Sequence, residues 1–588
     1  MPSTAPATTP APAATRGRSA NGGAPAANAD AERRRARAWR AAPLVVSALA
    51  AIAYLIVAPR TVDFAAGAYR AFLFGEEGLT LWNGNWYSGH HVLGYSVLFP
   101  PLAWLVGPRL LGALCAIAAA ALFERLLTGH FGARARWPAL WFGLASTAPL
   151  WSGRIPFLFG AAIGLGAALA LQRERRGLAV LLALACGLAS PVAGLFLALA
   201  VVAYGVARVE RRRSEGERGP VAGGRVARLR ALPGAARAGL RAARPAPAML
   251  AAAVLPAVLI AVAFSSDGRE PFDLSTFWPL PLLSIGFALV VPREQRTLRA
   301  AAVLYGLACC AAYVIDTPMG GNAARLGGLI GAPLLLAALL ARREPLGRPR
   351  LAVAALTLAG LAFIQWSPPV RDSIKAFEDP SVEASYYEPL NAFLDRQGGA
   401  PGRVEIPFTR SHWEAYEVGR HHPIARGWLR QADIERNGIF YGGVLDGLSY
   451  AAWLTEHGVR WVALPDAKPD YSSYDERALI EAGLPYLELR WRSAHWRVYE
   501  VTLPDAMVVS EGARFDLTEL GHDDLTLRAH GPGEATVRVG WSQYWKPDRG
   551  CVERDGEWTR VIADEAATIR VSMSFAPGRI VSRGRRCA

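Results

Sequence analysis

The chain has 588 residues, of which 52% are hydrophobic and only 19% are charged, and its formal net charge is +15. This composition is too apolar for an ordinary soluble protein and too long for a simple membrane anchor, so we expect an integral membrane protein with two or three domains. Arginine occurs in short runs between apolar segments, as the positive-inside rule produces, so the charge indicates membrane topology and not nucleic-acid binding.

The N-terminal region, residues 1–40, is predicted to be a disordered cytoplasmic tail. Its first 32 residues are mainly Ala, Pro, Thr, Gly and Asn, with almost no large apolar side chains to bury. A basic run begins at Arg33 and precedes the first apolar segment, which holds the N-terminus in the cytoplasm. No small-residue cleavage site follows that segment, so it is not a secretory signal.

Residues 41–366 are predicted to form a polytopic membrane helix bundle. Eleven apolar segments approach the ~20 residues that a helix needs to cross a bilayer. The pair around Ser190-Pro191 fits either two crossings or one broken helix. We expect membrane helices at 41–59, 101–123, 137–152, 154–172, 177–190, 193–208, 247–265, 276–292, 299–316, 324–341 and 350–366.

The charges of the loops assign a side of the membrane to each of them. With the N-terminus inside, every cytoplasmic loop is rich in arginine, and the longest, 209–246, holds about ten. We interpret that loop as a solvated segment lying against anionic lipid. An odd number of crossings then places the chain after Trp366 outside the cytoplasm. The loops of that side carry Asp63, Glu76, Glu77, Asp267, Glu270, Asp273 and Asp316.

The C-terminal region differs in composition and is predicted to form two extracytoplasmic domains. Residues 367–500 contain a helix that ends at Gly458 and the strand Val459–Leu464 after it, which indicates an α/β domain. Residues 501–588 contain runs of alternating polarity separated by Gly, Pro and Asp turns, which indicate a β-sandwich.

The cysteines fall into two groups. Four lie inside apolar segments, without CxxC spacing or a histidine partner, and are interpreted as small packing residues: Cys115, Cys186, Cys309 and Cys310. Cys551 and Cys587 flank the last predicted strands, and in an oxidising compartment we expect them to form a disulfide.

The loop after the first membrane helix carries the strongest functional signal. Asp63 follows that helix closely. A carboxylate at a membrane boundary costs free energy, so its presence there indicates a function. It is interpreted as a general base for a hydroxyl group, with a solvated cap or a salt bridge to Arg60 as the alternative. The aromatic segment after it contains Trp82, Trp86 and Tyr87, whose flat rings suit the faces of sugars.

This arrangement resembles the GT-C superfamily of integral-membrane glycosyltransferases. The resemblance is carried by the first helix with its N-terminus inside, Asp63, the segment Trp82-Asn-Gly-Asn-Trp-Tyr-Ser-Gly, and Leu98-Phe-Pro-Pro101. It implies a hexosyl- or pentosyltransferase that uses a polyprenyl-phosphate sugar donor. In that family an acidic residue of the first outer loop is the proposed base or metal partner, which here is Asp63. Many members carry two adjacent acids, whereas Asp63 is followed by Phe64. The acidic pair of the loop is Glu76-Glu77, which are further candidates for the catalytic carboxylate. Whether a divalent cation is a cofactor stays open.

Three basic residues are predicted to contact the phosphate of the donor. Arg154 lies at the outer membrane boundary and could bind a phosphate through two hydrogen bonds, with an ordinary snorkelling arginine as the alternative. His90 and His91 are predicted to neutralise the leaving phosphate or orient the acceptor, with a surface turn as the alternative.

A second cluster of sugar-compatible residues lies in the C-terminal region and is predicted to bind the acceptor beside Trp82, Trp86 and Tyr87. The alternative is a polar interface that packs the extracytoplasmic region onto the helices. The cluster consists of Glu405, His412, Trp413, Glu414, Arg426 and Trp428, and Arg430 and Gln431 belong to the same segment as Trp428.

Together these features predict transfer of a sugar from a polyprenyl-phosphate donor to a glycan or glycolipid of the cell envelope, on the outer face of the cell membrane. The sequence contains no common motif of soluble catalysis: G-x-S-x-G, the Walker loop and H-E-x-x-H do not occur. Two alternatives stay open. One is a transporter or flippase, which would need paired repeats or charges near the middle of the bilayer, and the other is a non-catalytic envelope-assembly protein.

Overall fold

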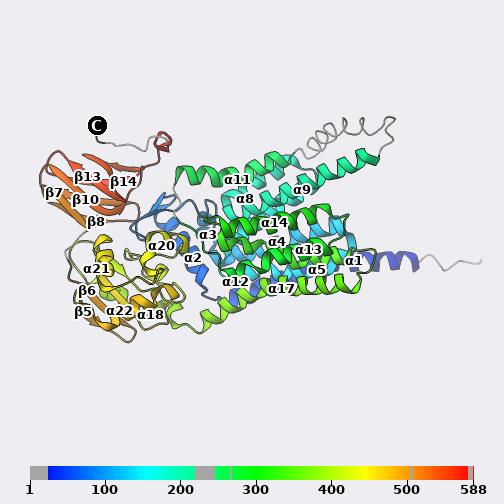
Figure 1. The fold of residues 1–588 in the computed structure, drawn as a ribbon, viewed down its shortest axis with the longest axis horizontal. Coiled ribbons are helices and arrows are strands. Elements are labelled where there is room, and N and C mark those ends of the chain that lie inside the picture. The colour runs from blue at the N-terminus through cyan, green and yellow to red at the C-terminus, as the bar shows by residue number, and fades with distance from the viewer. Residues whose placement is uncertain (1–23, 219–244, 265–267, 504–506, 581–586, 588) are drawn as a thin grey trace, which may run out of the picture.

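The computed structural model describes residues 24–218, 245–264, 268–503, 507–580 and 587. Residues 1–23 of the predicted tail and residues 219–244 of the predicted basic loop lie outside this range. The chain forms a bundle of long helices followed by a C-terminal region of short helices and sheets, which gather at one end of the bundle (Figure 1). The first helix begins near the opposite end.

The helical bundle confirms the predicted fold class. Eight stretches are long and apolar enough to cross a membrane, with shorter apolar helices at Arg176–Ala189 and Leu274–Val290, and all eleven predicted segments fall on helices. These are α1 (Ala24–Val57), α3 (Phe99–Val106), α4 (Pro108–Phe131), α5 (Arg136–Ala145), α6 (Ala148–Trp151), α7 (Ile155–Gln172), α8 (Arg176–Ala189), α9 (Pro191–Arg218), α11 (Ala246–Ala263), α12 (Leu274–Phe277), α13 (Pro279–Val290), α14 (Arg296–Val314), α15 (Ala324–Leu326), η3 (Gly327–Gly331), α16 (Ala332–Leu340) and α17 (Arg348–Phe377).

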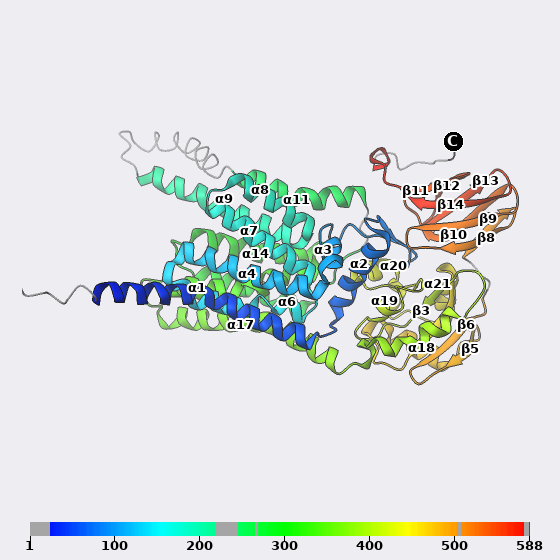
Figure 2. The same ribbon diagram turned by 180° about the vertical axis from the view of Figure 1, so that it is seen from behind.

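The loop between the first two predicted membrane segments contains a helix that the sequence analysis did not predict. Helix α2 (Val62–Glu77) begins with Asp63 in its first turn, where a negative charge stabilises the helix N-terminus. Phe64, Tyr69 and Leu73 are buried along it. The short strands β1 (Trp82–Asn83) and β2 (His90–His91) pair after it as a small hairpin. Helix α2 lies at the boundary between the bundle and the C-terminal region (Figure 2).

The first part of the C-terminal region is an α/β unit, as expected. Strand β3 (Arg403–Glu405) pairs in parallel with β4 (Val459–Pro465), and β6 (Trp496–Val501) and β5 (Leu487–Arg492) complete a four-stranded mixed sheet. The helices of this part are α18 (Ala384–Asp395), α19 (Glu414–Glu417), α20 (Arg430–Arg436), α21 (Gly447–Glu456) and α22 (Tyr474–Ala482).

The last part forms two antiparallel four-stranded sheets with one buried core, which fits the predicted β-sandwich. One sheet has the order β12-β13-β10-β7 and the other β11-β14-β9-β8. A disulfide joins Cys551 and Cys587. The strands are β7 (Val508–Gly512), β8 (Phe515–Leu520), β9 (Asp524–Ala529), β10 (Gly533–Gly540), β11 (Trp545–Pro547), β12 (Cys551–Asp555), β13 (Trp558–Ala563) and β14 (Ala567–Met573).

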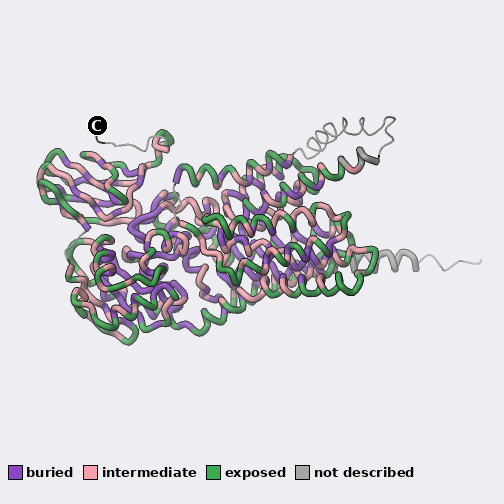
Figure 3. Tube along the Cα trace, in the orientation of Figure 1, coloured by how far each residue is buried: buried purple, intermediate pink, exposed green. Residues whose placement is uncertain are grey.

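Burial shows which helix faces meet lipid and where the two parts of the molecule join. Exposed residues follow the outer faces of the bundle (Figure 3), and many of them are large and apolar, such as Leu356 and Phe363. One continuous apolar cluster includes Phe123 of the bundle, Trp86 of the first loop and Trp496 of the mixed sheet. The C-terminal region is therefore packed against the membrane helices through the aromatic loop.

Candidate active site

A cavity of about 1390 Å³ lies where the membrane helices meet the C-terminal region. One part of its wall carries charged side chains, and another is formed by apolar side chains of α13 and α17. The charged residues are Asp63, Arg154, Glu270, Asp273, Arg325, Arg371 and Arg430, and the apolar ones include Leu282, Leu283, Val353, Leu356, Phe363 and Ile364. Leu282, Leu356 and Phe363 are also more than half exposed on the outer face of the bundle, so the apolar wall continues onto the surface that faces lipid.

Asp63 lies between two arginines from different parts of the chain. Its Oδ2 is 3.0 Å from Nε of Arg154 and 3.9 Å from an Nη of Arg325. Each of the three side chains is a fifth to a third exposed. The carboxylate is therefore held by guanidinium groups whose remaining N–H donors can bind an anion in the cavity.

Gly153 allows the loop that carries Arg154 to approach the start of α2. Its φ is +74°, and a Cβ at this position would lie 2.3 Å from the backbone nitrogen of Phe64, next to Asp63. No side chain fits at that distance from backbone, and the conformation itself favours glycine. The ion pair between Arg154 and Asp63 thus depends on a residue without a side chain.

Glu270 enters the same cavity from the segment before α12. Burial raises its pKa to about 7, Arg325, Arg430 and Arg154 act in the opposite direction, and Asp63 adds to the rise. A carboxyl group with such a pKa exchanges its proton near neutral pH, which is the property of a general acid or base.

Arg430 and Trp428 bring the C-terminal region into the cavity wall. Arg430 forms two hydrogen bonds of 2.9 Å to Asp470, and its guanidinium lies 4.9 Å from the ring centre of Trp428. Burial favours the neutral form of Asp470, but His412 and Arg430 outweigh it and hold the pKa of this carboxyl well below its usual range. Arg430 is therefore a fixed positive charge at the boundary between the two parts of the molecule.

Sequence reasoning identified three residues of this cavity, namely Asp63, Arg154 and Trp428. It did not assign a role to Glu270 or Arg325, and it included Arg430 in the sugar-compatible segment that contains Trp428. Arg325 lies inside the predicted membrane segment 324–341, and a charge in such a segment is a signal for a functional residue. For Glu270 the sequence holds no comparable signal, because Asp63, Arg154 and Arg430, which line the same cavity, are more than a hundred residues away from it along the chain.

Comparison with solved structures finds similarity over most of the chain. The crystal structure of ArnT from Cupriavidus metallidurans in the apo state is 13% identical, covers 80% of this chain and 99% of its own, and gives a TM-score of 0.38. ArnT from the same organism bound to undecaprenyl phosphate is 14% identical, covers 80% of this chain and 98% of its own, and gives 0.36. No family model and no curated protein sequence matches the chain. At this sequence identity and TM-score, the similarity assigns no function to the chain.

The other acidic candidates lie at the far end of α2. Glu76 and Glu77 end this helix, roughly 20 Å along its axis from Asp63 at ~1.5 Å per residue. The carboxylate of Glu77 is 3.1 Å from Nδ1 of His522 in the β-sandwich. Neither residue lines the cavity, so the structure does not bring this acidic pair together with Asp63.

The two histidines also lie outside the cavity wall. His90 is buried against the ring of Trp86, and burial, followed by the charges of Arg436 and Arg70, lowers its pKa well below the usual value. It is therefore uncharged at neutral pH. His91 contacts the β-sandwich, with its Nε2 3.4 Å from Oγ of Ser542. Phosphate contact by this pair stays a prediction.

Most of the aromatic residues predicted to bind an acceptor form internal contacts. Trp82 lies in the sandwich core 5.5 Å from Trp545, and Trp86 stacks on Tyr69 at 4.2 Å. Tyr87 donates a hydrogen bond to the carbonyl of Gly427, and Trp413 donates one of 2.9 Å to the carbonyl of Arg60. These four rings join the first loop to the C-terminal region, and of the predicted aromatic residues Trp428 lines the cavity.

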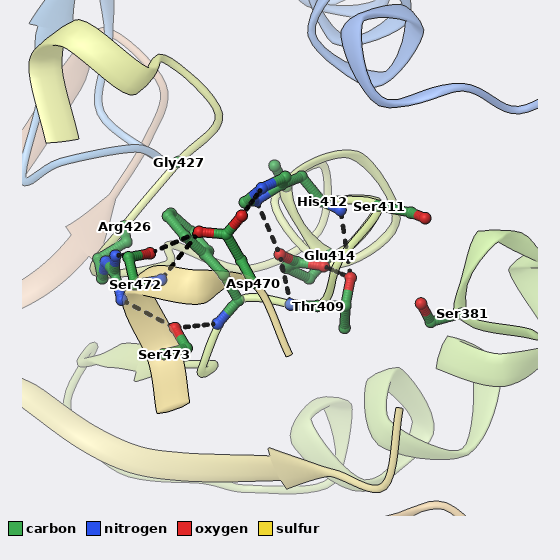
Figure 4. A network of polar contacts seen from close by, with 12 residues as sticks. Ser381, Thr409, Ser411, His412, Glu414, Arg426, Gly427, Asp470, Ser472 and Ser473 are labelled. Atoms are coloured by element: carbon green, nitrogen blue, oxygen red, sulfur yellow. Dashed lines mark hydrogen bonds and ion pairs between the residues drawn. The ribbon is translucent and has the colours of Figure 1, made fainter. Parts of the chain in front are cut away.

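Two polar residues of the same prediction, His412 and Glu414, belong to a buried network with Asp470 (Figure 4). The ring of His412 stacks on Trp428 at 3.6 Å, and its two nitrogens lie 3.6 Å from Glu414 and 3.5 Å from Asp470. Because His412 also lies 3.4 Å from Arg430, this network supports the side chains of the cavity wall without lining the cavity.

Glu405 and Arg426 belong to a second buried cluster of the mixed sheet. Arg426 forms two hydrogen bonds, of 3.1 and 2.7 Å, to Asp433, and it also lies 3.4 Å from Glu476 and 3.9 Å from Glu405. Burial, and then repulsion from Glu476, raise the pKa of Glu405 well above its usual range. The cluster holds the C-terminal region together, and acceptor binding by these two residues stays a prediction.

The residues of the cavity do not fit a divalent cation. Within the described ranges, no group of three His, Cys, Asp or Glu side chains comes together in a way that could hold a metal ion. Asp63 is already paired with two arginines, whose positive charges oppose a cation at this carboxylate.

Proposed function

We propose that this integral membrane protein is a glycosyltransferase of GT-C type. It transfers a sugar from a polyprenyl-phosphate donor to a glycan or glycolipid of the cell envelope, on the outer face of the membrane. The observation that carries this proposal is the composition of one cavity, in which arginines and carboxylates lie beside an apolar wall that reaches the lipid-facing surface.

The two parts of the cavity match the two parts of such a donor. Arg154, Arg325 and Arg430 supply guanidinium groups for a phosphate. The side chains of α13 and α17 supply an apolar surface for a hydrocarbon chain that remains in the bilayer. A soluble nucleotide sugar has no hydrocarbon chain that could bind to this apolar surface, so the cavity favours a lipid-linked donor.

The reaction needs positioning, a base and stabilisation of the leaving phosphate. The oxygen of an acceptor hydroxyl forms a bond to the anomeric carbon of the donor sugar while the bond from that carbon to the phosphate oxygen breaks. Its electron pair leaves with the phosphate, which the arginines stabilise. The hydroxyl proton passes to a carboxylate of the cavity, for which the sequence predicts Asp63 and the structure adds Glu270.

Two observations, the position of the cavity and the distribution of charge, support the outer face. The wall of the cavity includes Trp428, Arg430 and Gln431 of the C-terminal region, and this region gathers at one end of the bundle (Figure 1). The arginine-rich loops of the sequence are expected in the cytoplasm, which supports an extracytoplasmic position for the opposite end.

The test is transfer of labelled sugar by the purified protein. The assay supplies a membrane extract as the source of lipid-linked sugar and an envelope fraction that carries acceptors. We expect transfer by the wild type and a loss in Arg154→Ala and Arg325→Ala through weaker donor use, whereas Arg490→Ala on exposed strand β5 keeps the wild-type rate. Absence of transfer from every lipid-linked donor would reject the proposal.

One observation favours transport of the same lipid as a second candidate. The stretch Gly320–Leu340 beside the cavity begins with a 3-10 turn, Gly320–Ala323, and is interrupted by the π-helical residues Gly327–Gly331. Interrupted helices at a binding site are common in transporters. Proteoliposomes that contain lipid-linked sugar separate the two functions, since a flippase moves the intact lipid across the bilayer without releasing polyprenyl phosphate.

A further inference from the structure

We infer that Glu270 is the catalytic residue that accepts the proton of the acceptor hydroxyl, while Asp63 orients the arginines that bind the donor phosphate. This assignment rests on the proposed function and deepens it. It separates the roles of two carboxylates that line one cavity, and it differs from the role that the sequence alone suggests for Asp63.

The contacts of the two carboxylates point to this division. Asp63 is engaged by Arg154 at 3.0 Å and approached by Arg325 at 3.9 Å, so a proton on it would cancel the charge that both guanidinium groups bind. In the described part of the chain, no hydrogen bond of 3.5 Å or less and no ion pair within 4.0 Å engages the carboxylate of Glu270, although it lines the cavity. Glu270 is the carboxylate that is available to a hydroxyl group.

The backbone around Glu270 is fixed on two sides. The N–H of Glu270 donates a 3.1 Å hydrogen bond to the carbonyl of Thr317, and the N–H of Gly321 donates one of 3.1 Å to that of Pro271. On the other side, Gly268 has a φ of +96°, and a Cβ there would lie 1.9 Å from the carbonyl oxygen of Gln431, beside Arg430. The segment therefore lies between the turn that precedes α15 and the start of α20. A residue that meets a substrate with defined geometry needs such a fixed backbone.

The charges that face Glu270 keep its proton exchangeable near neutral pH. Burial raises its pKa to about 7, and Asp63 of α2 acts in the same direction. Arg325 of α15, Arg430 of α20 and Arg154 before α7 lower it. On its own segment, Arg269 is paired with Asp316 at 3.0 Å, and Asp273 also lines the cavity. Glu270 is therefore surrounded by cations without being bonded to one.

In the transfer step these groups take up the proton of the hydroxyl and stabilise the electron pair of the leaving phosphate. The hydroxyl oxygen forms the new bond to the anomeric carbon, and its proton moves to the carboxylate of Glu270. The bond between the anomeric carbon and the phosphate oxygen breaks, and its electron pair stays on the polyprenyl phosphate held by Arg154 and Arg325. After the product leaves, Glu270 releases the proton to water, which restores the base.

The experiment measures transfer and lipid binding in Glu270→Gln, Glu270→Asp and Asp63→Asn, with Glu488→Gln on exposed strand β5 as the matched control. Because only ionised Glu270 accepts a proton, kcat/KM of the wild type should rise with pH and reach half of its plateau near pH 7. Glu270→Gln should lose about 10²–10⁴-fold in kcat and the dependence on this ionisation. It should still bind polyprenyl phosphate as the wild type does. Glu270→Asp should keep part of the activity, which also shows that the segment folds.

Two results would overturn this assignment while the proposed function stands. One is a Glu270→Gln enzyme with the wild-type rate and pH profile. The other is a Glu270→Gln or Glu270→Asp enzyme that loses polyprenyl-phosphate binding as Asp63→Asn does, since that would make Glu270 a binding or structural residue. If the wild type transfers no sugar from any lipid-linked donor, the proposed function fails and the assignment fails with it.

Discussion

Asp63 occupies the point where three segments of the chain meet. Asp63 lies on α2, Arg154 lies in the turn between α6 and α7, and Arg325 lies on α15. A buried or half-buried charge that loses its partner is costly, because the remaining charge is left without compensation. Each of the three side chains therefore influences the position of the other two.

Replacing Asp63 by Asn tests what this carboxylate does. The amide keeps the size but removes the charge that orients Arg154 and Arg325, so we expect a higher KM for the lipid-linked donor and weaker binding of polyprenyl phosphate. Asp63→Glu should keep part of the binding, because the charge remains. Steady-state kinetics with varied donor measure both parameters, and Asp395→Asn at an exposed site of α18 serves as the control. A fall of kcat by about 10²–10⁴-fold at unchanged KM would instead make Asp63 the base.

At the scale of single residues, the sequence predicted two of the charged residues that line the cavity, Asp63 and Arg154. Asp63 and Arg154 could be found because each lies at the predicted boundary of a membrane segment. Glu270 could not, because only the fold brings it into the cavity that Asp63 lines. Trp82, Trp86 and Tyr87 have the composition of a sugar site, yet their rings are buried against Trp545, Tyr69 and the backbone near Gly427. Composition alone does not distinguish a binding loop from an interface rich in aromatic side chains.

At the scale of elements, the approach of the α6–α7 turn to α2 is the contact on which the cluster depends. Gly153→Ala should lower the stability by about 1–3 kcal/mol for the positive φ alone, and the added Cβ should push Arg154 away from Asp63. We expect a lower Tm of the detergent-solubilised protein and weaker polyprenyl-phosphate binding.

Gly205→Ala in α9 is the matched control, because nothing lies within 4 Å of a Cβ at that position. Equal Tm and binding in the two variants would show that the turn tolerates a side chain and that the cluster does not depend on this approach.

The helices of the bundle were predictable because apolar runs of sufficient length bounded by arginine leave few other structures in a membrane. Helix α2 was missed because polar and charged residues interrupt its apolar face, as in Tyr69-Arg70 and Glu76-Glu77. Its burial comes from contacts with α3 and with the C-terminal region, such as that of Phe64 with Trp413 at 6.1 Å, and the latter contacts are not visible along the chain.

At the scale of the whole molecule, the C-terminal region and the cavity share one end of the bundle, so the side of the membrane that holds this region also holds the site. We expect a reporter fused after Gln397 to be active only outside the cytoplasm, and one fused within 215–240 only inside. Paired alkaline phosphatase and green fluorescent protein fusions measure this. The opposite result at either position would place the site in the cytoplasm and remove the basis for an envelope acceptor.

The apolar wall of the cavity on α13 and α17 has a consequence for how the rate is controlled. A substrate that arrives through this wall never leaves the bilayer, so its effective concentration is a surface density, in molecules per unit area of membrane, and not an amount per volume. Adding inert lipid at a constant amount of protein and of donor would then lower the surface density of both and slow the reaction. The composition and area of the surrounding membrane would act as kinetic variables of the protein.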